Sequence, residues 1–190
     1  TLHSVRAPPG RSDVDVQLKI LQIVSSLLVT YANVTSELLS RALMLCFTLY
    51  EHSRVVVVSS TAAAMLRQNV MVVFEKVQSE DQSFDAIQNE DAAVNAPLPV
   101  GTAELPSGPV TLFPCAADVY HLLNDLCALA DGQPAQFLPL DTLSKPFVLE
   151  LLESVLTTQS SLFQRPPELG YILRSAACPV FLQALRLALV

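Results

Sequence analysis

The chain has 190 residues, which is long enough to bury one sizeable hydrophobic core. Apolar residues make up 51% of it, charged residues 15% and aromatic residues only 6%, with no tryptophan. A core built from leucine, valine and alanine is typical of close-packed helices and argues against a β-sandwich. The net charge is −7 and Lys and Arg form no basic stripe, which argues against nucleic acid and against electrostatic docking on anionic lipid.

The first residues and one internal segment have compositions unlike the rest. Residues 1–11 contain two prolines and a glycine, and we expect them to be a disordered lead. Residues 78–115 hold six acids and no Lys or Arg, which leaves a net charge of −1 for the rest of the chain. Apart from Phe84 and Ile87, segment 78–114 has little apolar surface to offset its ordering entropy. We therefore expect a long, mobile, acidic and proline-rich insertion there.

The helical spacing of apolar residues predicts about seven helices. Before the insertion they are expected over 12–30, 35–50 and 53–77, and after it over 116–130 and from about 144, 166 and 178 onwards. The run Val55–Val58 has strand propensity, but no turn separates it from the helical stretch Thr61–Gln68, so we expect one continuous helix. Apolar residues cover most of its circumference, which predicts that it is the central helix of the domain.

This succession of amphipathic helices predicts an all-α fold, with residues 12–190 forming a single domain. Short loops between helices of 12–25 residues are typical of an armadillo- or HEAT-like helical solenoid, and a compact irregular bundle is the alternative. The apolar helix at the end of the chain has no cap in sight, so we expect the chain to be part of a longer protein.

No pattern in the sequence points to catalysis, a cofactor or a metal. Nucleophile elbows and H-E-x-x-H runs are missing, and the five glycines form no phosphate-binding loop. Cys115, His121 and Cys127 are evenly spaced, but six helical residues rotate by about 600°, so Cys127 points about 120° away from His121. Glu150 and Glu153 are three apart on one helix, where a solvated face is the common outcome. We expect no enzyme activity, cofactor or metal ion.

The cysteines and the hydropathy indicate a cytosolic protein. Cys46, Cys115, Cys127 and Cys178 include no C-x-x-C pair, and three of them lie in apolar helical patterns. We expect reduced, buried thiols, with disulfides as the alternative. A signal peptide and an unbroken membrane-spanning run are not expected either.

Three segments carry a family resemblance. They are Leu38–Tyr50; Val58–Gln68 with its continuation Val73–Val77; and a third set made of Asp118–Tyr120, Asp125–Cys127, Phe147–Leu156 and Cys178-Pro179. Together they resemble the N-terminal DCB (dimerisation and cyclophilin-binding) domain of the large Arf guanine-nucleotide exchange factors. The string Leu-Glu-Leu-Leu-Glu-Ser-Val-Leu and the later Cys-Pro are more similar to their non-exchanging relatives, the monensin-sensitivity (Mon-two) Golgi scaffolds. The resemblance covers about Val16 to Leu185 without the acidic insertion.

The resemblance implies a cytosolic domain that is peripheral on Golgi, trans-Golgi network and endosome membranes. The partners it implies are Arf and Arf-like small GTPases, a second copy of the chain, the HUS-type helical region that follows in the same protein, and a Dopey-type protein. Exchange activity in this family resides in a separate domain. The implied function is therefore a non-catalytic regulatory and scaffold module in Golgi–endosome vesicle trafficking. A generic HEAT-like interaction module in another assembly is the alternative, and we expect no nucleic acid and no direct membrane insertion.

The sequence does not mark a binding face. The candidate partner-binding residues are the polar ones of the matched segments: Arg67, Gln68, Tyr120, Asp125, Lys145, Glu150 and Glu153.

Overall fold

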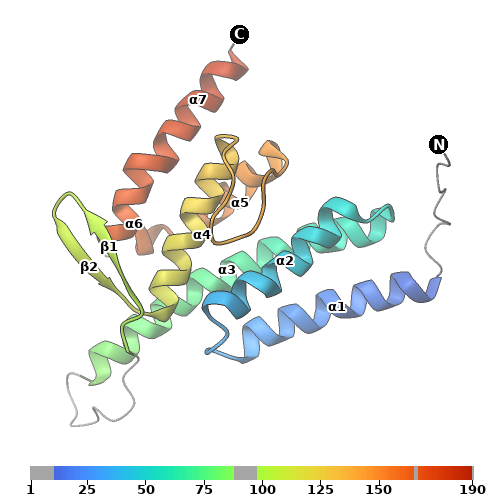
Figure 1. Cartoon of the computed structure of the whole chain (residues 1–190), viewed down its shortest axis with the longest axis horizontal. Helices are drawn as coiled ribbons and strands as arrows, with labels where there is room; N and C mark the ends of the chain where they lie inside the picture. The colour runs from blue at the N-terminus through green and yellow to red at the C-terminus, as the bar shows by residue number, and fades with distance from the viewer. Residues whose placement is uncertain (1–10, 88–97, 165–166, 190) are drawn as a thin grey trace.

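The computed structural model describes residues 11–87, 98–164 and 167–189, so the expected disordered lead, apart from Arg11, lies outside the described residues. The elements are α1 (Arg11–Thr30), α2 (Ser36–His52), α3 (Val56–Ile87), β1 (Gly101–Leu105), β2 (Gly108–Leu112), α4 (Pro114–Ala130), α5 (Lys145–Thr158), a 3-10 turn (Ser160–Phe163), α6 (Pro167–Ile172), a π turn (Leu173–Ala177) and α7 (Cys178–Ala188) (Figure 1). This confirms the predicted all-α class, with one small hairpin added. The solenoid arrangement stays a prediction.

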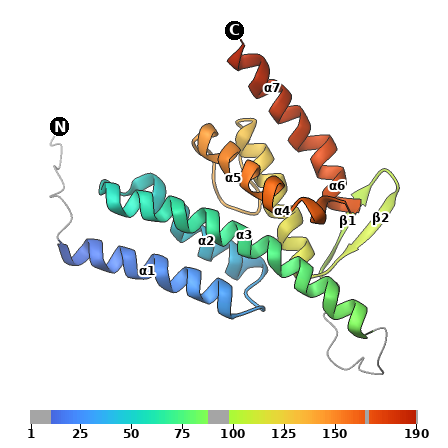
Figure 2. The same ribbon diagram turned by 180° about the vertical axis from the view of Figure 1, so that it is seen from behind.

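The long helix α3 is the centre of the fold, as its apolar circumference predicted. Helices α1, α2, α4 and α5 all pack on it (Figures 1 and 2). Its inward side chains are almost fully buried: Val58, Ala62, Leu66, Val70, Val73, Phe74 and Val77. Val56–Val58 of the valine run are helical, whereas Val55 precedes the helix, and the Thr61 hydroxyl donates to the Val57 carbonyl at 2.7 Å.

The stretch Val56–Glu80 of α3 is long and apolar enough to cross a membrane by length and composition alone. Polar residues such as Arg67, Glu75 and Lys76 interrupt this stretch, so it is not an unbroken apolar run. A core helix passes the same test, and the packing of four other helices on α3 accounts for its apolar character.

The structure corrects the expectation that 78–114 is without regular structure. Helix α3 continues to Ile87, and residues 101–112 form an antiparallel hairpin in which Leu105 pairs with Gly108. Gly108 has a φ of +117°, a conformation that a residue with a Cβ atom rarely adopts. Alternate hairpin residues, Ala103 and Leu112 among them, are buried against Ala117 of α4. Residues 88–97 of the segment lie outside the described part, and its mobility stays a prediction.

The thiols differ in their surroundings, and no disulfide joins them. Cys46 and Cys127 are buried as expected, but Cys115 is half-buried and Cys178 is exposed. Burial raises the pKa of the Cys46 thiol to about 11, which keeps this thiol protonated at neutral pH.

Truncating the buried face of α3 should destabilise the whole fold. Leu66 is 0% exposed, so Leu66→Ala should lower the free energy of unfolding by about 2–5 kcal/mol through lost burial and a residual cavity. Val57 lies on the same helix and is 58% exposed, so Val57→Ala should change the free energy of unfolding by less than about 0.5 kcal/mol. Urea denaturation followed by circular dichroism measures both, and equal effects would contradict the central role of α3.

Candidate interaction surface

Helix α1 carries two apolar stripes that face different ways. The inner stripe, Leu21, Val24 and Leu28, is buried in the core. The outer stripe has the i, i+4, i+7, i+11 spacing of a helix–helix seam and consists of Val16, Ile20, Ile23 and Leu27. Val16 is 55% exposed, Ile23 57% and Leu27 42%, so this stripe is largely uncovered.

Helix α2 has an outer stripe with the same spacing: Leu38, Ala42, Leu45 and Leu49. Leu38 is 62% exposed and Leu45 is 51% exposed, whereas Ala42 and Leu49 are partly buried against the core. Helices α1 and α2 run antiparallel beside each other and are joined by a short connection (Figure 1). A rise of about 1.5 Å per residue spaces Leu38 and Leu45 along α2 by the same distance as Ile20 and Leu27 along α1.

We call the exposed members of these stripes the apolar α1–α2 face: Val16, Ile23, Leu27, Leu38 and Leu45. All five are aliphatic, so the face offers hydrophobic burial rather than chemistry. Fully burying a large aliphatic side chain contributes about 1.5–3 kcal/mol, and covering the part that is still exposed here contributes about half of that. Monomeric soluble proteins rarely expose large contiguous apolar patches. The face is therefore suited to bind another protein surface.

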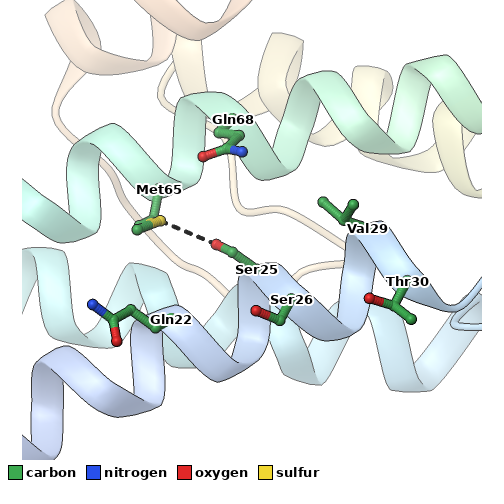
Figure 3. A pocket seen from close by; sticks show the side chains of 7 residues that line it. All are labelled: Gln22, Ser25, Ser26, Val29, Thr30, Met65 and Gln68. Carbon is green, nitrogen blue, oxygen red and sulfur yellow. Dashed lines mark hydrogen bonds between the residues drawn. The ribbon is translucent and has the colours of Figure 1, made fainter.

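A groove of about 470 Å³ lies on the other side of α1, between α1 and α3. Figure 3 shows its lining residues, which are Gln22, Ser25, Ser26, Val29 and Thr30 from α1 and Met65 and Gln68 from α3. The Ser25 hydroxyl is 3.1 Å from the Met65 sulfur and 2.8 Å from Asn69 Oδ1. Ser25 is thus committed to holding α1 on α3, and the described lining has no charged side chain.

Of the polar candidates from the sequence, Arg67 and Glu150 are brought together. Arg67 donates from Nε and Nη2 to the two carboxylate oxygens of Glu150, each at 2.8 Å, and its guanidinium lies 5.3 Å from the centre of the Phe147 ring. The hydrogen bonds lower the pKa of the Glu150 carboxyl and raise the pKa of Arg67. This pair joins α3 to α5, so both charges are engaged within the chain.

The other polar candidates are scattered. Asp125 is buried and accepts hydrogen bonds from the backbone N–H groups of Gln136 at 2.8 Å and Leu138 at 2.6 Å, so it holds the connection between α4 and α5. Tyr120 packs on the hairpin cluster, Gln68 lies at the α1–α3 groove, and Lys145 and Glu153 are separate positions on α5. Whether any of them contacts a partner stays a prediction.

Sequence reasoning missed the apolar α1–α2 face because the search for partner contacts was confined to polar residues. The available signal was the width of the α1 stripe, since Ile20, Ile23 and Leu27 fall beside the inner positions. A stripe that is too wide for one neighbour indicates a second apolar surface.

A second polar cluster fixes the start of α2 and the start of α4. Asp118 of α4 is 2% exposed and accepts a hydrogen bond from the Ser36 backbone N–H at 2.8 Å. Glu80 of α3 accepts from the N–H groups of Cys115 and Ala116, each at 3.1 Å. The Lys76 amine donates to the carbonyls of Tyr31 at 2.9 Å and Val34 at 3.5 Å. Thr35 precedes α2 and makes no side-chain cap bond, and Asp118 supplies an acceptor for the first N–H of the helix.

Burial raises the pKa of the Asp118 carboxyl to about 7, and nearby Glu80 adds to this shift. The Ser36 N–H and Lys76 act in the opposite direction, and burial lowers the pKa of Lys76 itself. A carboxyl whose pKa is higher in the folded than in the unfolded state binds a proton on folding. This proton uptake stabilises the folded state. The stabilisation is complete below the pKa of the unfolded chain and is lost as the pH rises through about 7, the pKa of Asp118 in the folded chain.

Replacing this carboxyl should therefore remove a pH dependence. Asp118→Asn keeps the acceptor oxygen for Ser36, so we expect it to be more stable than the wild type at pH 8, and the advantage to shrink by roughly 2 kcal/mol at pH 5. Urea unfolding of both proteins at both pH values measures the difference, and Glu75→Gln, an exposed acid on α3, is the matched control. A constant gap between Asp118→Asn and the wild type would contradict this assignment.

The Arg67–Glu150 pair should show a coupling in stability. Because its side chains are 35% and 47% exposed, a double-mutant cycle with Arg67→Ala and Glu150→Ala should give only about 0.5–1 kcal/mol. The lowered pKa of Glu150 means that this contribution is present at neutral pH and is lost as the pH falls through that pKa. Thermal melts of the four proteins measure the cycle. Additive effects of the two substitutions would show that the Arg67–Glu150 pair contributes no coupling energy to stability.

Comparison with known proteins places the chain. Residues 10–81 match the model of the Mon2/Sec7/BIG1-like dimerisation and cyclophilin-binding (DCB) domain, and residues 115–189 match the model of the Mon2/Sec7/BIG1-like HUS domain. Helices α1 and α2 and most of α3 thus fall in the DCB match, and α4 to α7 fall in the HUS match. The resemblance implied a HUS-type region after this chain, whereas the HUS model matches within it.

Curated relatives agree with the family models. Protein MON2 homolog of Xenopus laevis is 38% identical over 168 residues, covering 88% of this chain and 9% of the relative. The human protein of the same name is 36% identical and the Drosophila melanogaster one 33%, each over 88% of this chain and 9% or 10% of the relative. The chain spans about a tenth of the length of these relatives. It therefore belongs to the Mon2/Sec7/BIG1-like family and carries DCB and HUS segments of that family.

Proposed function

We propose that this chain is a non-catalytic regulatory and scaffold module in Golgi–endosome vesicle trafficking, and that it binds a second copy of itself through the apolar α1–α2 face. The five uncovered aliphatic side chains of that face are the observation that carries the proposal. The family model matched by residues 10–81, which include both helices, is described as a dimerisation domain. Membership of the Mon2/Sec7/BIG1-like family supports the trafficking role.

The geometry suits a symmetric contact. Two antiparallel helices with seam-like stripes can pack on the same pair of a second copy around a twofold axis, which gives a four-helix arrangement. In such a contact the same patch of both copies is used, so aliphatic side chains meet aliphatic side chains. The free energy comes from aliphatic burial, at about 25 cal/mol for each Å² removed from water.

Arf-family GTPases are the second proposed partner, as the family resemblance implies. The α1–α3 groove supports this choice, because it lies on a different side of α1 from the apolar face and stays open when that face is covered. Exposed Val29 and Gln68 at its rim would be available to a GTPase bound to a dimer. A Dopey-type contact and contacts with the rest of a longer scaffold are further proposals that follow from the family alone.

Charged substitutions in the face should abolish self-association without unfolding the chain. Ile23→Asp or Leu45→Asp would bury a carboxylate in an apolar contact, and the dimer dissociation constant should rise at least about 100-fold. Val57→Asp, an exposed valine of α3 outside the face, is the matched control. Sedimentation velocity over a concentration series measures the association, and circular dichroism checks the fold. A wild type that is monomeric at every concentration, or variants that dimerise equally well, would overturn the proposed face.

A parallel pull-down separates the two partners. The wild type and the Ile23→Asp variant are each presented with a panel of Arf and Arf-like GTPases loaded with GDP or a GTP analogue. Capture of a GTP-bound member by both proteins supports a GTPase surface apart from the dimer face. Failure of both to capture any GTPase would remove the GTPase proposal and leave self-association to stand or fall on sedimentation alone.

A further inference from the structure

A pocket lies where the tip of the hairpin meets α6 and the π turn, in the part of the chain that carries the HUS match. Its volume is about 410 Å³, within the range of sites that hold small ligands or single peptide side chains. The described lining consists of Leu105, Pro106, Ser107, Pro167, Tyr171, Arg174 and Ser175. The pocket is separate from the apolar α1–α2 face, so a ligand bound in it is independent of the proposed function.

Arg174 is the one charged side chain in this described lining. It is exposed, and among the described residues no hydrogen bond or ion pair engages it, unlike Arg67 and Arg41. Its guanidinium lies against Gly170, one turn earlier in α6, where a Cβ atom would stand 3.5 Å from Nη1 and 4.0 Å from Nη2. A Cβ atom at these distances would be in ordinary van der Waals contact, so the guanidinium lies beside the Gly170 backbone, and its donors stay unused among the described residues.

The helix geometry at this position is unusual. Residues Leu173–Ala177 form a π turn between α6 and α7, and such turns are frequent at functional sites. Pro179 gives a local cause, since it has no N–H to donate to the carbonyl of Ser175. The wider turn changes the direction of Arg174 and Ser175 from that of a regular α-helix.

The rest of the lining suits a single negative group on an apolar stem. Leu105, Pro106 and Pro167 provide apolar walls, and the guanidinium can form a charge-assisted hydrogen bond with an anionic group. Tyr171 and Ser107 add hydroxyl groups from two different elements, whereas the Ser175 hydroxyl already donates to the Tyr171 carbonyl at 2.8 Å.

We propose that this pocket binds the carboxylate of an Asp or Glu side chain in a partner peptide, with Arg174 as its anchor. A planar guanidinium matches a carboxylate in the two-pronged manner that Arg67 and Glu150 already show within this chain. The described lining offers a single positive charge, and the chain as a whole has a net charge of −7. A singly charged carboxylate therefore matches this pocket better than a doubly charged phosphate does. The proline-rich walls and the neighbouring strand β1 fit a peptide in extended form.

The test is a two-dimensional NMR titration of the labelled chain with the peptide acetyl-Ala-Leu-Glu-Leu-Ala-amide, up to on the order of 10 mM because one side chain gives only a weak contact. The expected result is a saturable shift of the Arg174 Nε–Hε signal and of the amides of Ser107 and Tyr171. The counterpart peptide with Gln in place of Glu should bind at least about 10-fold more weakly, because it cannot form the charge-assisted pair.

Variants of the chain distinguish this site from a general effect of charge. Arg174→Gln should weaken binding of the Glu peptide at least about 10-fold. Arg174→Lys should weaken binding less, because lysine keeps the positive charge and loses only the two-pronged hydrogen bonding of the guanidinium. Arg186→Gln, which removes an exposed arginine from α7 outside the pocket, should leave binding unchanged. Equal binding by Arg174→Gln, shifts confined to other regions, or no shifts at all would overturn the proposal. A phosphoserine peptide that binds about 10-fold more tightly than the Glu peptide would overturn the assignment to a carboxylate.

Discussion

Three buried or half-buried carboxylates satisfy the backbone donors that this fold leaves open at its chain reversals. Every helix start has N–H groups without an intrahelical acceptor, and such groups are costly when they are removed from water. Here the acceptors come from distant parts of the sequence: Asp118 for Ser36, Glu80 for Cys115 and Ala116, and Asp125 for Gln136 and Leu138. The helical framework of α3 and α4 therefore determines where the other elements begin.

The apolar α1–α2 face and the Arg174 pocket both depend on this arrangement. Asp118 and Lys76 fix the connection from α1 to α2, and with it the relative position of the two stripes of the apolar face. Glu80 ties the start of α4 to α3, and the hairpin that precedes α4 packs on Ala117 one turn later. The tip of the hairpin then meets α6, which forms the Arg174 pocket. Neither surface contributes to these bonds, so each is free to change without loss of the fold.

The sequence predicted what is local and missed what depends on neighbours. The starts of α1, α2, α5 and α7 were predicted to within two residues, because periodicity and prolines are local signals. The hairpin was missed because its two prolines and Glu104 hid a two-residue alternation that includes Ala103 and Leu105. Glu80 was interpreted as part of an acidic, solvated segment, and only the distance to Cys115 and Ala116 shows it as a cap. The exposure of Ile23 likewise depends on how α2 and α3 pack against α1, and this packing is not encoded in the local sequence pattern.

The boundary between the two family models runs through one hydrophobic core. Helix α3 begins in the DCB match and continues past its last residue, 81, to Ile87. Its Phe74 lies 6.4 Å from Phe163 of the HUS match, ring centre to ring centre, and one contiguous cluster extends from Leu21 to Val180. Separating the two segments would expose the face of α3 that packs on α4 and α5, and would leave the start of α4 without its carboxylate cap. The DCB and HUS segments therefore share one core through α3, and neither can be removed without exposing buried surface of the other.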